Sequence, residues 1–195
     1  MEIKFTKKMF IKIIFLAILF SFPTSGLLCK EAKKRNICIK IGANYFSPSE
    51  KSFKDIYGGG MAIGGEINIK LWKFIDFWLV GNYYSKKGSL PFTKEETKMT
   101  LIPIGGGLKI RFQKGAINPY IGLGPVIYVY KETNPIGVAK GTNVGFIGQA
   151  GCYFNIVEGL LFDVCINYSY CSVKPQKIRS NLGGIHAGIG IGYAF

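Results

Sequence analysis

The sequence has few of the residues that most enzymes and metal proteins use. It contains one histidine, His186, and its charged fraction of 18% is below the roughly 25% of ordinary soluble domains. The five cysteines form no CxxC pair and no metal-ligand spacing. The glycine runs lack the strand-then-helix context and the spacing of a phosphate loop. We therefore expect no enzyme activity, no cofactor and no metal site.

Acidic residues are scarcer than basic ones. The 195 residues include 25 Lys and Arg but only 11 Asp and Glu, for a formal net charge of +14. Such a balance indicates contact with nucleic acid or with an anionic membrane surface. The basic residues are scattered, with no basic helix and no nucleic-acid motif, so we expect no nucleic-acid partner.

The N-terminal apolar run, Ile13–Phe22, is shorter than the roughly 20 residues of a membrane-spanning helix. Lysines precede it and the small-residue segment Pro23–Gly26 follows, which is the pattern of a secretory signal peptide. We predict a cleaved signal peptide over 1–26 and a short basic lead over 27–35. An uncleaved anchor and lipidation of Cys29 remain alternatives, although Leu28 is large for a lipoprotein signal.

What the sequence has in quantity is apolar alternation with a period of two, and it is clearest in Leu182–Phe195. Isoleucine, alanine and aromatic residues occupy every second position there, and glycine fills most of the others. Strict alternation over this length predicts a β-strand. The apolar face ends in Tyr193 and Phe195, which suits a strand that closes a barrel in a membrane, with aromatics at the interface.

Seven earlier segments alternate in a similar way and are long enough to cross a bilayer when tilted. They cover 36–46, 61–71, 76–86, 98–112, 119–130, 143–156 and 160–172. The connections alternate between long and short, which predicts outward-facing loops at 47–59, 87–97, 131–142 and 173–181. The predicted fold is an all-β, eight-stranded, antiparallel, up-and-down transmembrane barrel. A soluble lipocalin-like barrel, with its apolar face inward, is the main competitor.

Residues 36–195 resemble the small outer-membrane β-barrel domain family, the opacity-protein-like or porin-family eight-stranded barrels. The resemblance rests on the signal peptide and on three segments: NPYIGLGPVIYVY at 118–130, GFIGQAGCYFNI at 145–156 and the terminal GIGIGYAF. It implies an exported protein of the cell outer membrane. It also implies that Tyr193 and Phe195 carry a signal read by the barrel-assembly machinery. Members of this family serve as adhesins, anchors or narrow pores, so the resemblance specifies no activity.

Six charged residues fall on the predicted inner face of the barrel, and charges in a low-dielectric interior need partners. We predict a lumen network in which Glu66 and Asp163 bridge the basic members; the set is Lys40, Glu66, Lys70, Lys109, Arg111 and Asp163. The alternative is an anion-selective pore, although side chains fill the interior of an eight-stranded barrel. His186 also faces inward, away from the lipid side where a lipid-modifying barrel enzyme places its catalytic residues, so lumen packing is the expected role.

Basic residues are frequent in the predicted outer loops and could meet lipopolysaccharide phosphates. They are Lys51, Lys54, Lys87, Lys94, Lys131, Lys140, Lys174, Lys177 and Arg179. The leading functional hypothesis is an integral surface protein whose loops make contacts outside the cell, with outer-membrane lipid and lipopolysaccharide as partners. A narrow pore for small solutes or ions is the alternative, and a lipid-modifying enzyme is the third.

Overall fold

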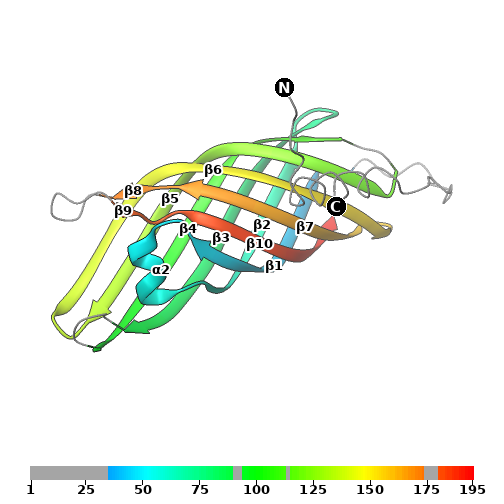
Figure 1. Cartoon of the computed structure of the whole chain (residues 1–195). Coiled ribbons are helices and arrows are strands. Elements are labelled where there is room, and N and C mark those ends of the chain that lie inside the picture. The colour runs from blue at the N-terminus through cyan, green and yellow to red at the C-terminus, as the bar shows by residue number, and fades with distance from the viewer. Residues whose placement is uncertain (1–34, 90–93, 113–114, 174–179) are drawn as a thin grey trace, which may run out of the picture. The chain divides into compact units, whose positions relative to one another are not determined.

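The computed structural model describes residues 35–89, 94–112, 115–173 and 180–195, which form a closed antiparallel barrel (Figure 1). Its eight strands lie in the order β1-β10-β7-β6-β5-β4-β3-β2. Their bounds are β1 Ile37–Pro48, β2 Gly60–Lys70, β3 Ile75–Ser89, β4 Glu96–Arg111, β5 Ile117–Asn134, β6 Gly137–Val157, β7 Leu160–Tyr170 and β10 Gly184–Ala194. The predicted fold class is confirmed, and the predicted signal peptide, Cys29 and the basic residues 174, 177 and 179 lie outside the described residues.

The first and last strands close the barrel. β10 pairs with β1 over Cys38 to Pro48, with Ile41 opposite Ile191. The Phe195 amide donates to the Ile37 carbonyl at 2.8 Å, and the Phe195 carbonyl accepts from the Asn36 amide at 3.0 Å. The last residue therefore belongs to the hydrogen-bonded sheet, so these strands leave no open edge.

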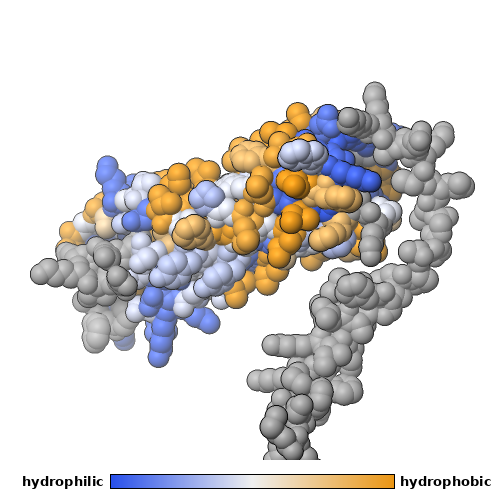
Figure 2. Space-filling view, turned by 90° about the horizontal axis from the view of Figure 1, so that it is seen from above, coloured by the Kyte–Doolittle hydropathy of each residue, from blue (hydrophilic) through white to orange (hydrophobic). Residues whose placement is uncertain are grey.

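The period-two pattern of the sequence becomes an apolar outside and a mixed inside. Ile41 and Leu123 are both 70% exposed on the outer face, whereas the inward side chains of Trp78 and Lys109 are fully buried. Figure 2 shows apolar side chains gathered over the middle of one face, with hydrophilic ones toward both ends. A soluble lipocalin-like barrel would have the reverse arrangement, so that competitor is wrong.

The two ends of the barrel differ in their connections. At the turn end, where β1 begins and β10 finishes, strands are joined by short segments over 71–74, 112–116 and 158–159. At the loop end, the connections include a helix, two protruding hairpins and the segment 171–183. This is the predicted alternation of short and long connections, although the structure shortens two of the predicted loops.

The structure replaces the predicted loop at 131–142 by a continuation of the β5–β6 hairpin. Residues 131–134 pair with residues 137–140, and only Pro135 and Ile136 form the turn. The Asn134 side-chain oxygen accepts from the amides of Ile136 and Gly137 at 3.1 and 3.0 Å, which fixes the reversal. The prediction was wrong because polar residues that continue a strand beyond the membrane were interpreted as a loop.

The predicted loop at 87–97 is shortened in the same way. β3 continues to Ser89 and β4 begins at Glu96, with Lys87 opposite Lys98. Residues 90–93 lie outside the described part of the chain. Two long hairpins, β3–β4 and β5–β6, therefore extend past the other strands at the loop end (Figure 1).

The predicted loop at 47–59 contains a short helix, α2 (Lys51–Tyr57), which was not expected. Phe53 and Tyr57 are buried and lie one helical turn apart. Tyr57 donates to Glu132 at 2.8 Å and lies 2.9 Å from the Thr97 hydroxyl. Burial raises the pKa of Tyr57, which keeps the hydroxyl protonated as a donor. The Tyr57 side chain thus ties the helix to Thr97 on β4 and Glu132 on β5.

Within the described residues, no helix has the length and apolar character needed to span a membrane. In the segment after β7, β8 (Ser172–Val173) and β9 (Ser180–Asn181) form a two-stranded sheet. Residues 174–179, between these two strands, lie outside the described part of the chain. The Asn181 side-chain oxygen accepts from the amides of Cys171 and Gly183 at 3.0 and 2.9 Å. These bonds join the two ends of the segment to each other through Asn181.

Candidate functional site

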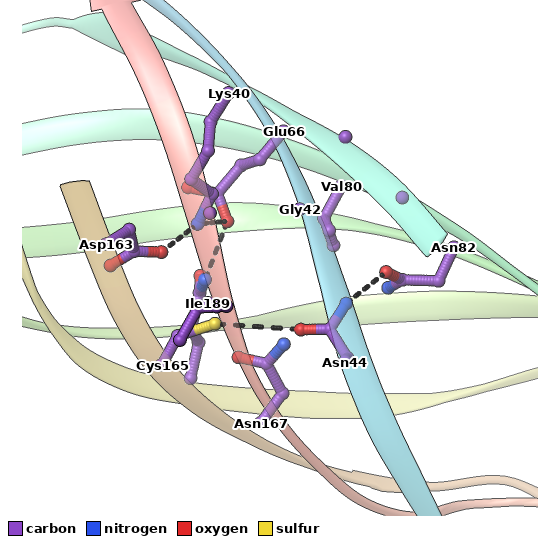
Figure 3. Close-up of a pocket in the computed structure, with 14 residues that line it drawn as sticks. Lys40, Gly42, Asn44, Glu66, Val80, Asn82, Asp163, Cys165, Asn167 and Ile189 are labelled. Carbon is purple, nitrogen blue, oxygen red and sulfur yellow. Dashed lines mark hydrogen bonds and ion pairs between the residues drawn. The ribbon is translucent and has the colours of Figure 1, made fainter. Parts of the chain in front are cut away.

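The lumen near the turn end contains four ionised side chains in contact. Lys40 on β1 forms ion pairs with Asp163 on β7 and with Glu66 on β2, the latter at 3.3 Å. Figure 3 shows Lys40 extending between the two carboxylates. Glu66 in turn pairs with Lys109 on β4 at 2.5 Å. The result is a chain of alternating charges, Asp163, Lys40, Glu66 and Lys109, across the lumen.

Neutral donors and acceptors complete the bonding of this cluster. Lys109 donates to Asn68 and to the Tyr153 hydroxyl, both at 2.8 Å. Gln149 donates to Glu66 at 2.6 Å. Tyr120 donates to Asp163 at 2.9 Å. Because all four charged side chains are almost fully buried, these bonds supply the contacts that water would otherwise provide.

Strand register brings these residues to one level of the lumen. Lys40 lies directly opposite Glu66 in the β1–β2 pair, and Tyr153 lies opposite Asp163 in the β6–β7 pair. A one-residue slip would turn either pair outward toward the membrane. Glycine provides the space: a methyl group at Gly151 would collide with the Tyr120 hydroxyl. The inward Gly151 therefore makes room for a large lumen side chain.

Two of the six predicted members lie apart from this cluster. Arg111 bonds Asp76 on the neighbouring strand β3, with Arg111 Nε 3.1 Å from a carboxylate oxygen. Lys70 makes no ion pair within the described residues and lies opposite Asp76 in the β2–β3 pair. The basic residues nearest the turn end therefore gather around Asp76 rather than around Glu66 and Asp163.

The sequence reasoning omitted Asp76, Asn68, Gln149, Tyr120 and Tyr153 from the network. All five have the inward parity of their strands, so the alternation places them in the lumen. Parity alone does not say which inward residues lie at the same level, because that depends on the stagger between strands. The charged residues could be predicted because a buried charge needs a partner. The neutral residues have no such requirement, so nothing in the sequence singled them out.

A small cavity lies beside the cluster, toward the middle of the barrel (Figure 3). Its volume is about 20 Å³, which is room for roughly one water molecule. The side-chain oxygens of Gln149 and Asn167 have no hydrogen-bond partner among the described residues. Two unpaired acceptors at a polar cavity suit a bound water. A cavity of this size does not admit a solute.

The half of the lumen nearest the loop end is filled by apolar and aromatic side chains. Phe46 packs edge to face on Tyr84 with ring centroids 5.0 Å apart, and Phe53 of α2 lies against Phe46. His186 stacks on Phe46 with centroids 4.4 Å apart and is 3% exposed. The histidine therefore lies in the packed lumen, away from the lipid face.

The remaining candidates for chemistry lie apart. The cysteines Cys38, Cys152, Cys165 and Cys171 are free and buried, and no group of three His, Cys, Asp or Glu in the described residues could hold a metal ion. The predicted assembly residues Tyr193 and Phe195 are exposed on β10 and just beyond it, with ring centroids 4.9 Å apart. Their exposure leaves them accessible at the turn end, and their part in assembly stays a prediction.

Comparison with known proteins gives likenesses of structure only. No family model and no curated protein matches the sequence. Among solved structures, the outer membrane protein OprG of Pseudomonas aeruginosa superposes with a TM-score of 0.64 at 16% identity, over 84% of this chain and 97% of that one. Neisserial surface protein A has a TM-score of 0.55 at 15% identity, over 82% and 97% of the two chains. Ail of Yersinia pestis, in complex with the heparin analogue sucrose octasulfate, has a TM-score of 0.53 at 14% identity, over 83% and 100%. With its apolar outer face and filled lumen, the chain has the fold of the small eight-stranded outer-membrane β-barrels.

Proposed function

We propose that this chain is an integral outer-membrane protein with a closed lumen, which acts through the surfaces it presents at the loop end. The filled lumen is the observation that carries the proposal. Ion-paired and aromatic side chains occupy the interior along its length, and the cavity beside the charged cluster holds about one water molecule. A barrel of this kind supports surface contacts more readily than transport through its axis.

The loop end supplies the surfaces for such contacts. The hairpin turn exposes Ile136, at 87%, and both long hairpins bear exposed lysines. Helix α2, which connects β1 to β2, presents Lys51 and Lys54 to solvent. The structurally similar proteins are outer-membrane proteins, which supports the same location for this chain.

Conductance in a planar bilayer tests the proposal. The purified full chain is expected to insert without discrete current steps, because no continuous water path crosses the charged cluster and the aromatic packing. OprG prepared in the same detergent serves as a structurally similar reference. Regular current steps in proportion to the inserted protein would contradict the closed lumen and favour the narrow-pore alternative.

Location is tested separately by the mobility of the chain on gels. Membrane fractions are compared boiled and unboiled, since a folded barrel resists detergent and migrates differently until heated. We expect a heat-dependent shift in the outer-membrane fraction. Recovery as a soluble periplasmic protein with no shift would contradict the proposed location. The lipid-modifying alternative predicts altered lipid A in a deletion strain, and we expect unchanged lipid A.

A further inference from the structure

Positive charge on the outer face of the barrel is confined to one wall. We define the basic wall as Lys87 on β3, Lys98 on β4, Lys131 on β5 and Lys140 on β6; all four are exposed. They are the outward-facing Lys and Arg residues on the eight barrel strands described. The neighbouring strands β7, β10, β1 and β2 carry none on their outer faces.

Strand register places these lysines side by side. Lys87 lies opposite Lys98 across the β3–β4 pair, and Lys131 lies opposite Lys140 across the β5–β6 pair. Between the two hairpins, Lys98 lies opposite Thr133 and Lys131 opposite Thr100. Like charges directly opposite in a sheet are destabilising. Two such pairs on neighbouring hairpins indicate an external anion that offsets the repulsion.

Internal carboxylates supply little of that compensation. Glu96 pairs with Lys87 at 3.2 Å, with both side chains well exposed. Lys98, Lys131 and Lys140 have no ion-pair partner among the described residues. Three adjacent cations on one wall are therefore available to a ligand.

The position of the basic wall along the barrel axis places it at the edge of the apolar belt. Along three strands the outward residues run from apolar or aromatic to hydroxyl to lysine: Tyr83, Ser85, Lys87; Ile102, Thr100, Lys98; and Val144, Thr142, Lys140. On these three strands the lysine thus lies four residues, about 13 Å along the strand, past the last residue of the apolar belt, whereas on β5 Lys131 lies two residues past Val129. With strands tilted by about 40°, the four-residue separation is about 10 Å along the membrane normal, within reach of lipid headgroups.

From this arrangement we infer that the basic wall binds the phosphates of lipid A in the outer leaflet of the protein's own membrane. The inference rests on the proposed outer-membrane location. A lipid phosphate matches the lysines in charge, and its acyl chains would lie along the apolar belt directly beneath. The lysine-free wall offers no equivalent, so the lipid associates with one side of the barrel.

The test uses the full chain in detergent micelles, titrated with diphosphoryl lipid A and, separately, with the same lipid lacking its phosphates. Bound lipid is counted by native mass spectrometry. The variant is Lys98→Gln/Lys131→Gln/Lys140→Gln. The matched control, Lys51→Gln/Lys54→Gln/Lys73→Gln, removes the same charge from exposed lysines on α2 and in the 71–74 connection, outside the wall.

We expect the wall variant to bind diphosphoryl lipid A at least tenfold more weakly than wild type, since each lysine near an anionic surface contributes roughly fivefold. The control variant is expected to bind as wild type does, and the lipid without phosphates is expected to bind weakly to all three proteins. Equal binding by the wall variant, an equal loss in the control, or equal binding of the dephosphorylated lipid would each overturn the inference.

Two further measurements distinguish a failure of this inference from a failure of the proposed function. The heat-dependent gel shift of each variant shows whether it still folds as a barrel, so a lost shift identifies a folding defect. If the wall variant folds and binds lipid A normally, the inference fails while the proposed function stands. Retention on immobilised heparin that depends on the three lysines, without lipid A binding, would assign the wall to a sulfated glycan and overturn the lipid assignment.

Discussion

Near the loop end, Phe46, Tyr84 and Tyr128 fill the lumen by packing of rings, whereas near the turn end Glu66 and Lys109 fill it by an ion pair within a hydrogen-bonded cluster. The two halves are built from the same strands and are comparably buried. They differ in how well they tolerate substitution of a lumen side chain. Apolar packing accepts changes of shape at moderate cost, but a buried charge whose partner is removed has no substitute.

The largest expected effect therefore comes from breaking the charged half. Glu66→Gln removes the carboxylate that pairs with both Lys40 and Lys109, leaving Lys109 buried without its ion-pair partner. We expect the free energy of unfolding in lipid vesicles to fall by about 3–5 kcal/mol. Urea titration with the heat-dependent gel shift as readout measures this change. Unchanged stability would show that the cluster is not a stabilising network.

A substitution on the outer face tests the cost of an unpaired charge in contact with lipid. Ile189 is 55% exposed, and its backbone lies opposite Ala43 and Val164. Ile189→Arg places a charge against hydrocarbon and should lower the free energy of unfolding by about 2–4 kcal/mol if the residue lies near mid-membrane. The same urea titration measures it, with Ile189→Leu as the control. A stable, correctly assembled arginine variant would contradict the face assignment.

A matched pair of tyrosines compares the two halves directly. Tyr153 contacts Lys109 and Glu66 at 2.8 and 3.0 Å, whereas the Tyr128 hydroxyl lies 2.6 Å from the neutral Ser169 hydroxyl. Removing one hydroxyl should cost about 1.5–3 kcal/mol in Tyr153→Phe and about 1 kcal/mol in Tyr128→Phe. Equal losses of stability would show that charge does not distinguish the two halves.

The smallest effect is expected for an ion pair outside the lumen. Glu96 and Lys87 meet at 3.2 Å with side chains 80% and 72% exposed. Glu96→Gln should change the free energy of unfolding by less than about 1 kcal/mol, because solvent screens the pair and side-chain entropy opposes it. A loss as large as that of Glu66→Gln would contradict burial as the source of the difference.

Period-two alternation in the sequence was enough to predict the barrel, the number of its strands and the inward or outward face of residues on most of them. The alternation survives because each outward position faces an apolar medium, and a single slip would reverse it. Strand ends were predicted less well. Lys131 and Lys140 continue the hairpin beyond the membrane, where hydrophobicity no longer marks the outer face.

The candidate site was predictable in part. Lys40, Glu66, Lys109 and Asp163 come together because each is inward and charged, and a closed lumen leaves such groups few partners except one another. Arg111 joined Asp76 instead, since these residues lie one strand apart at the turn end. Pairing of this kind depends on the stagger of the strands around the barrel. The alternation within each strand does not determine that stagger, so these pairs could not be predicted from it.

The bonds between Phe195 and the start of β1 also constrain how the molecule can form. The strands that complete the circle, β1 and β10, are the barrel strands farthest apart in the chain, so β1 can meet its second neighbour only after β10 has been synthesised and exported. Until then both outer strands present unpaired backbone groups that invite association with other chains. Such non-local pairing folds slowly. The chain therefore has to be kept apart from its own copies during transit, and removal of even the last few residues should yield aggregated material instead of a smaller barrel.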